Sequence, residues 1–403
     1  MLSAAGMLAA SLPGASLPAA SLPVSSLRPL RLQPAALALL LPADRRANLT
    51  VLDLTRSGIV GLALQDFARL RPDIIASAIV REGWTAEVGG TLLEAIEAGT
   101  SGIDLVISSQ GAALEGMALG LWQPLDRWVL DQLPPLETIL TPLALRMLAL
   151  MAPYALPLAA APGGPVLVHR QGIATPRNPA ELLDWARENP RRFLYLYPPL
   201  TQGGRCFLAA LPFLLGDAAP SDPERGWDRT WAFLEALDPH IAFYPVTGLG
   251  AAEEFQDDEC DMLALSLSED ILFRGLDLLP ADTDLGAFEP SALVPVGTCL
   301  MVPRDLDAAD APEVALLIAY LMSEAVQDDL TFGQGRRWSQ SAHRDALLED
   351  RPLAVQVELH ALMRPGMEAL IAAHPVTPPY PLAAWNAMFD LWEARIGAQH
   401  GQL

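Results

Sequence analysis

The residues from Thr201 to Arg205 form a polar loop of a kind that can bind a small molecule. The loop reads Thr-Gln-Gly-Gly-Arg, follows the apolar run Phe193–Tyr197 and two prolines, and precedes an apolar stretch that predicts a helix. N–H groups at a helix start lack intrahelical partners, the helix dipole adds partial positive charge, and glycines let a ligand approach the main chain. Arg205 could add a bidentate donor for a carboxylate or phosphate group. A strand-to-helix turn without a ligand is the alternative.

Other polar loops follow the predicted strands and offer further ligand contacts. Ligands of open α/β sheets bind beyond the carboxyl ends of the strands, so we expect these loops to meet. They supply neutral donors, aromatic rings and arginine, but no nucleophile paired with a base. The candidate ligand-binding residues are Arg56, Ser57, Trp84, Ser108, Ser109, Gln110, Thr201, Gln202, Gly203, Gly204, Arg205, Tyr244 and Ser266. The alternatives are turn formation by the small residues, a core position for Trp84 and a surface ion pair for Arg56.

The composition excludes several kinds of chemistry. All 26 basic residues among the 403 are arginine, which excludes Schiff-base chemistry, pyridoxal-phosphate anchoring and the lysine of a phosphate-binding loop. The three cysteines and six histidines show no disulfide framework and no metal-ligand spacing. We therefore expect no cofactor and no metal site. A net charge of −22 without a long basic run also argues against nucleic acid as a partner.

The elements that must position these loops alternate between strands and helices. Strand candidates are Leu49–Leu54, Ile74–Val80, Asp104–Ser108, Val166–His169, Phe193–Tyr197, Ile241–Val246, Asp261–Leu267 and Leu293–Val302. Helix candidates are Gly58–Leu70, Thr91–Ala98, Pro179–Glu188, Trp227–Leu237, Pro312–Ser323 and several segments after Leu353. Such alternation is typical of parallel α/β sheets.

The order of these elements predicts two lobes. Residues 1–46 repeat Ala-Ser-Leu-Pro and form a low-complexity segment. We expect this segment to be either disordered or an export signal. The signal would be atypical, because prolines interrupt its apolar run and no basic residue precedes that run. Pro157–Pro165 is expected to be a linker between lobes. Residues 47–157 and 296–345 are assigned to lobe 1, residues 166–292 to lobe 2, and residues 346–403 to C-terminal helices that pack on the lobes. No membrane-spanning helix is expected.

Several segments, taken in order, resemble the extracellular solute-binding proteins of ABC importers, in a branch near the polyamine, thiamine and iron binders. The resemblance runs from about Leu49 to Trp338. The segments that carry it are Ser101–Val106, Tyr154–Pro157, Gly164–His169, Asn178–Ala186, Pro198-Pro199 with Gly203–Arg205, Asp261-Met262 and Ala319–Gln327.

The resemblance implies an α/β fold of the type II periplasmic-binding-protein architecture. Each of the two lobes would be a mostly parallel sheet with flanking helices, and a two-strand hinge would join them. The protein would not be an enzyme but the substrate-binding component of an ABC import system, which captures a small polar solute by lobe closure and passes it to a membrane permease. We expect a periplasmic or extracellular monomer. Gln202 stands where anion-binding members often have a glycine.

Two other functions would use the cleft between the two lobes. A two-lobed α/β transferase or hydrolase would need a nucleophile with a base, which the sequence does not show. A cytoplasmic ligand-sensing module of the same fold would agree with the atypical N-terminal segment, but residues 1–47 are too rich in proline for a DNA-reading helix-turn-helix.

Overall fold

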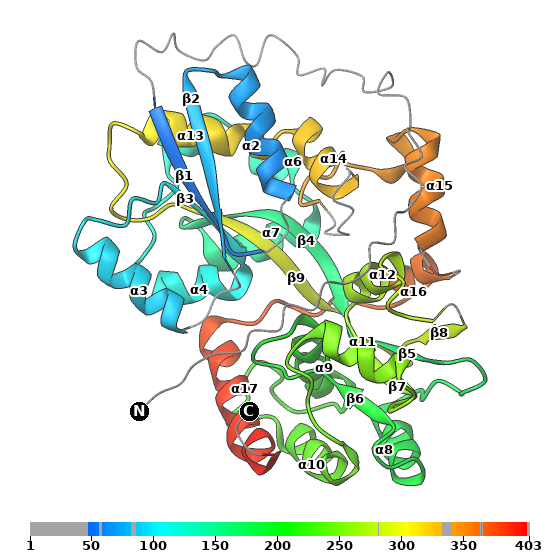
Figure 1. Ribbon diagram of the computed structural model, residues 1–403. Helices are drawn as coiled ribbons and strands as arrows, with labels where there is room; N and C mark the ends of the chain where they lie inside the picture. Colours follow the sequence, from blue (N-terminus) through cyan, green and yellow to red (C-terminus); the bar gives the residue numbers. More distant parts are fainter. Residues whose placement is uncertain are drawn as a thin grey trace, which may run out of the picture. The chain divides into compact units, whose positions relative to one another are not determined.

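The computed structural model describes residues 47–55, 59–81, 86–280, 282–332, 341–362, 364 and 366–400. The segment 1–46 and the candidate residues Arg56, Ser57 and Trp84 lie outside the described residues. The described chain forms two β-sheets with flanking helices (Figure 1). This arrangement confirms the predicted α/β fold with one sheet in each half.

The first sheet has the strand order β2-β1-β3-β9-β4. Its strands are β1 (Ala47–Asp53), β2 (Ile74–Val80), β3 (Leu105–Ser109), β4 (Ala155–Gly164) and β9 (Val294–Met301). β1 pairs in parallel with β2 and β3, because helices α2 and α3 return the chain between these strands. The helices of this half are α2 (Ile59–Leu70), α3 (Ala86–Glu97), α4 (Gln110–Ala118), α5 (Arg127–Leu130), α6 (Leu136–Ile139), α7 (Pro142–Met151), α13 (Ala311–Leu321) and α14 (Glu324–Phe332).

The second sheet has the strand order β6-β7-β5-β8. Its strands are β5 (Val166–Arg170), β6 (Phe193–Tyr195), β7 (Met262–Leu265) and β8 (Thr283–Gly286). β6 and β7 are parallel, whereas β5 is antiparallel to β7 and β8. The helices of this half are α8 (Pro179–Glu188), α9 (Gln202–Leu214), α10 (Asp228–Leu237), η2 (Asp238–His240), α11 (Gly248–Gln256) and α12 (Leu267–Gly275).

The stretch that the sequence predicts to be a linker is a buried strand. β4 pairs antiparallel with β9 from Ala155 opposite Met301 to Gly164 opposite Val294. Proline removes a ladder hydrogen bond and is tolerated at bulges. The register of β4 shifts next to Pro157 and Pro162, so the prolines that argue against a strand lie where the ladder is irregular.

Three further details of the sheets differ from the sequence-based expectation. Both sheets are mixed rather than mostly parallel, because β9 and β5 each run antiparallel to their two neighbours. The run Ile241–Val246 is not a strand; one hydrogen bond joins it to the main chain after β6, from Tyr197 N–H to the Pro245 carbonyl (2.9 Å). β8 was not predicted, since Thr-Asp-Leu-Gly contains residues that are depleted in strands.

The C-terminal helices form part of the second core. They are α15 (Leu353–Leu362), α16 (Met367–Ala373) and α17 (Leu382–Arg395), with short turns η3 (Leu348–Asp350) and η4 (Gly397–His400). Met388 and Trp392 of α17 are fully buried among residues of β5, β6 and β7. The indole N–H of Trp392 donates a hydrogen bond to the Tyr195 hydroxyl of β6 (3.0 Å).

A buried ion pair joins the C-terminal segment to helix α12. Arg364, between α15 and α16, donates to both carboxylate oxygens of Asp270, with Nη2–Oδ1 at 2.7 Å and Nε–Oδ2 at 3.0 Å. The same guanidinium donates to the hydroxyl of Thr283 on β8 (2.9 Å) and to its carbonyl. The side chain of Arg364 is 7% exposed and that of Asp270 is 0% exposed. Arg364 therefore connects α12, β8 and the C-terminal helices.

Replacing Arg364 is expected to destabilise the protein strongly. Arg364→Met leaves the carboxylate of Asp270 buried without its cation, which should lower the free energy of unfolding by about 3–5 kcal/mol. Urea denaturation followed by circular dichroism measures this change. Arg187→Gln is the matched control, because the Arg187–Asp184 pair is 52% and 71% exposed and should contribute less than about 1 kcal/mol. Equal changes in unfolding free energy for the two variants would contradict the stabilising role of the buried Arg364–Asp270 ion pair.

Candidate functional site

The carboxyl end of β3 runs directly into helix α4 at the predicted site residues Ser108, Ser109 and Gln110. Ser108 is buried in the sheet opposite Cys299 of β9. The Ser109 hydroxyl caps α4 by accepting a hydrogen bond from the N–H of Ala112 (3.3 Å). The cap fixes the direction in which the helix leaves the sheet. Gln110 is thereby held at the first position of the helix.

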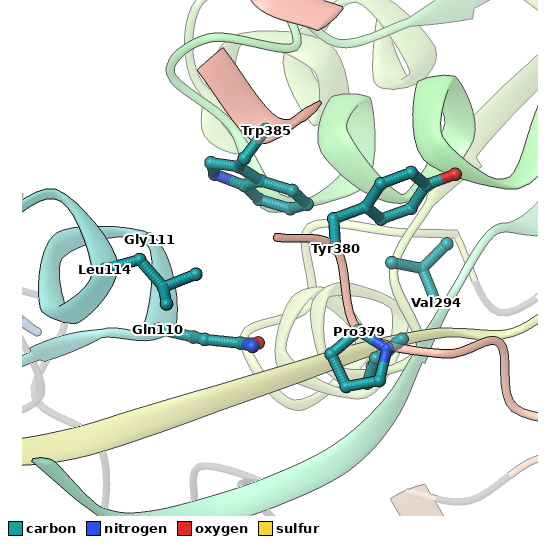
Figure 2. Close-up of a pocket in the computed structure, with 8 residues that line it drawn as sticks. Gln110, Gly111, Leu114, Val294, Pro379, Tyr380 and Trp385 are labelled. Carbon is teal, nitrogen blue, oxygen red and sulfur yellow. The ribbon is translucent and has the colours of Figure 1, made fainter. Parts of the chain in front are cut away.

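A cavity lies beside Gln110 (Figure 2). It is bounded by α4, by the start of β9 and by the C-terminal segment around the start of α17. Its interior volume is about 10 Å³, which is room for about one water molecule and far less than the roughly 300–1,000 Å³ that is typical of small-molecule sites. The lining residues are Gln110, Gly111, Leu114, Val294, Pro295, Pro379, Tyr380 and Trp385.

The side-chain amide of Gln110 is the polar group that faces this cavity. In Figure 2 it extends towards the space between Pro379, Tyr380 and Trp385. Its Nε2 atom is buried and has no hydrogen-bond partner among the residues that the structure describes. A buried donor without a partner is costly, by about 1–3 kcal/mol. Such a group is therefore available to a bound molecule.

Two aromatic residues of the C-terminal segment form the wall opposite Gln110. Tyr380 is buried, and its hydroxyl donates to the Ala209 carbonyl of α9 (2.7 Å). The rings of Tyr380 and Trp385 are 6.1 Å apart. Trp385 also lies against α4, since a Cβ added at Gly111 would be 2.9 Å from the indole nitrogen. Glycine at this position lets the indole approach the helix closely.

The loop Thr201–Arg205 does not line the cavity, and the N–H groups of Gly203 and Gly204 have partners within the protein. Thr201 caps α9, and its hydroxyl accepts from the N–H of Gly204 (3.3 Å). The N–H of Gly203 donates to the carboxylate of Glu269 (3.2 Å). In this structure both glycine N–H groups therefore donate within the protein, and the expectation that this loop binds the solute stays a prediction. A side chain of the protein itself provides the anionic group at the start of α9.

The side chain of Arg205 also has its contacts within the protein. Its guanidinium donates to the carbonyls of Pro198 (3.2 Å) and Pro199 (2.6 Å) and lies over the ring of Phe389 on α17, 5.7 Å from the centroid. Burial lowers the pKa of Arg205 from its usual value. These contacts hold the turn between β6 and α9, and Arg205 is not among the residues that line the cavity beside Gln110.

Gln202 and Ser266 lie together where helices α9 and α12 begin. The Gln202 amide donates to the hydroxyls of Ser266 (3.1 Å) and Ser268 (2.7 Å). Ser266 caps α12 in a capping box with Glu269, whose carboxylate accepts from the Ser266 N–H (2.8 Å). Desolvation raises the pKa of Glu269, although the hydrogen bonds from Ser266 and Gly203 oppose the shift.

Tyr244 occupies the second core rather than a surface that a solute could reach. It is 4% exposed. Its ring lies 4.9 Å from that of Tyr195 and 5.0 Å from that of Trp392. Its hydroxyl donates to the carboxylate of Asp238. The candidate residues thus divide into three places: the cavity at Gln110, the paired starts of α9 and α12, and the core around Tyr244.

The thiols of Cys206, Cys260 and Cys299 are buried, and burial raises the pKa of each. Within the described part of the chain, no group of His, Cys, Asp or Glu side chains could hold a metal ion. No described helix is long and apolar enough to cross a membrane.

The comparisons with known proteins agree with this fold. The family model of the bacterial extracellular solute-binding proteins matches residues 78–340, more than half of the chain, and the chain belongs to that family. The comparison with curated proteins found no match.

Solved structures share the fold at low sequence identity. One is an ABC transporter protein from Clostridium perfringens (TM-score 0.64, 15% identity, 88% of this chain and 100% of that one). A second is an ABC transporter substrate-binding protein from Bradyrhizobium japonicum (TM-score 0.62, 17% identity, covering 87% of this chain and 99% of that one). A third is the spermidine/putrescine ABC transporter substrate-binding protein of Streptococcus pneumoniae (TM-score 0.61, 12% identity, covering 88% of this chain and 99% of that one).

Sequence reasoning missed the aromatic wall of the cavity. Tyr380 stands in the run Pro378-Pro379-Tyr380-Pro381, just before α17, and Trp385 follows one turn into that helix. Prolines restrict the main chain and hold an aromatic side chain in place. This run was the available signal, but residues so far from α4 in the sequence gave no indication that they contact it.

Replacing Gly204 by alanine is expected to lower the stability of the protein. A Cβ at this position would be 2.1 Å from the Leu196 carbonyl oxygen and 2.7 Å from the Thr201 hydroxyl. Gly204→Ala should lower the free energy of unfolding by about 1–3 kcal/mol, measured by urea denaturation. Gly90→Ala, in the open interior of α3, should instead raise it by about 0.5–1 kcal/mol. A stable Gly204→Ala protein would show that the main chain there moves freely.

The buried carboxylate of Glu269 should make stability depend on pH. Because desolvation raises its folded-state pKa above the ordinary value of a glutamate, the folded state holds this proton more tightly than the unfolded state does. The contribution is fully present below the unfolded pKa and is lost as pH rises through the folded pKa. Unfolding free energies from about pH 4 to about pH 8 should therefore fall more for the natural chain than for Glu269→Gln. Parallel pH profiles would exclude this role for Glu269.

Proposed function

We propose that this solute-binding protein captures a small polar solute for an ABC importer and holds part of that solute in the cavity beside Gln110. The observation that carries the proposal is the cavity itself. It combines a buried amide donor, whose Nε2 has no partner among the described residues, with the aromatic side chains of Tyr380 and Trp385. Such pockets of apolar walls with few polar groups are typical of small-molecule sites.

The position of the cavity supports a mechanism in which two lobes close on the solute. It lies where β9 leaves the second half of the chain and enters the first sheet, and it is lined by residues from α4, β9 and the C-terminal segment. In this proposal, residues 47–157 with 296–345 form one lobe and residues 166–292 form the other. The C-terminal residues 346–403 pack on both. Solute binding then favours the closed arrangement because the solute contacts the first lobe at α4 and the C-terminal segment, which packs on the second core.

The other parts of the proposal follow from the family. The protein acts outside the cytoplasm, periplasmic or extracellular, as a monomer, and delivers its solute to a membrane permease. It catalyses no reaction. Ser108 and Ser109 are proposed to support the site by positioning Gln110. Thr201, Gln202, Gly203, Gly204, Arg205 and Ser266 are proposed to shape the neighbouring surface through the starts of α9 and α12, where Glu269 accepts the Gly203 N–H.

A thermal-shift panel tests the proposed function. Amides, amino acids, sugars and amines, including spermidine and putrescine, are each added to the full chain. A solute at 100 times its Kd should raise the unfolding free energy by about 2.7 kcal/mol and so raise Tm, and the shift should grow with the logarithm of solute concentration. Small-angle X-ray scattering should then show a smaller radius of gyration. Turnover of a solute would favour an enzyme, and a panel without any stabilising solute would contradict the proposal.

A further inference from the structure

We propose that the cavity beside Gln110 is a subsite for an uncharged hydrogen-bond acceptor of the solute, of the kind that an amide or ketone carbonyl provides. The inference rests on the proposed solute-binding function and adds the chemical class of the group that this part of the site takes. It combines three observations: a donor without a partner, walls without charge and flat apolar surfaces.

The donor is Nε2 of Gln110. This atom is buried, and it has no hydrogen-bond partner within the described ranges of the chain. An amide N–H that has lost water and gained no protein acceptor is unfavourable in the empty protein, so an acceptor placed in the cavity removes that cost. The group that enters must therefore offer an oxygen lone pair to Gln110.

The charge of that group follows from the lining. The eight residues around the cavity include no acidic or basic side chain. The nearby α9 carries Arg205, but its guanidinium already donates to the carbonyls of Pro198 and Pro199. An ionised carboxylate or ammonium group would lose hydration without gaining a counter-charge. A neutral carbonyl accepts the same hydrogen bond without that penalty.

The shape of the cavity favours a small planar group. Tyr380 and Trp385 provide aromatic surfaces, and Pro295 and Pro379 provide apolar ones (Figure 2). Planar groups pack on aromatic rings with little loss of conformational freedom. The interior volume of about 10 Å³ is that of about one water molecule, so it admits the acceptor oxygen and the rest of the solute lies outside this subsite.

A second glutamine provides a matched control. Nε2 of Gln123 is also buried without a partner in the described structure, but Gln123 does not belong to the cavity lining. Replacing either glutamine by leucine removes one unpartnered amide. Only the change at Gln110 should alter binding, whereas both proteins should keep or raise the Tm of the natural chain.

The experiment uses the full chain labelled with 5-fluorotryptophan at its nine tryptophans and observed by fluorine NMR. Trp385→Phe identifies the Trp385 resonance. The probes are propionamide, propionate and propylammonium, which are similar in length and differ in charge. Propionamide should shift the Trp385 resonance in a saturable way, and Gln110→Leu should weaken this binding at least tenfold while Gln123→Leu leaves it unchanged. Gln110→Glu, which keeps the side-chain shape and removes the donor, should also lose propionamide binding.

Three results would overturn the inference: no saturable shift with propionamide, an equal shift with propionate or propylammonium, or unchanged affinity in both Gln110 variants. The solute panel separates this inference from the proposed function. A panel solute that stabilises the natural chain and Gln110→Leu equally would reject the subsite but keep the function. Propionamide binding without any stabilising panel solute would keep the subsite and reject the function.

Discussion

The antiparallel pairing of β4 with β9 is the constraint on which the rest of the architecture depends. The two strands are far apart in the sequence, yet they pair from Ala155 opposite Met301 to Gly164 opposite Val294. The chain between them forms the second sheet. β9 also pairs with β3, so its position sets the distance between the start of α4 and Val294, both of which line the cavity. Closing so long a loop costs chain entropy, which the buried ladder must offset.

The second half depends in turn on residues that follow the first sheet in the sequence. Trp392 and Met388 complete its core, and Arg364 neutralises Asp270 at the start of α12. The same C-terminal segment contributes Tyr380 to the packing against α9 and Trp385 to the packing against α4. One stretch of chain therefore stabilises the second core and forms a wall of the cavity.

Local patterns were sufficient for most elements and for one residue, Gln110, of the cavity lining. β-Branched residues predicted the strand Ile74–Val80, and the N-cap Asn178 with Pro179 at the first position predicted the helix Pro179–Glu188, both at their observed bounds. Ser108, Ser109 and Gln110 were identified because polar residues at a strand end predict a loop facing the ligand. β4 was missed because its prolines lie at irregular points of a ladder that only β9 reveals. The partners of Gly203 and Arg205 were not predictable either, since Glu269 and Phe389 reach them from distant segments.

The position of Tyr380 and Trp385 near the end of the numbered chain also has a consequence for the order of events during synthesis. α4, β4 and β9 are complete long before residues 379–385 leave the ribosome. A chain that has not reached residue 379 lacks Pro379, Tyr380 and Trp385, and with them the wall of the cavity that faces Gln110. The cavity is therefore complete only after most of the chain has been made.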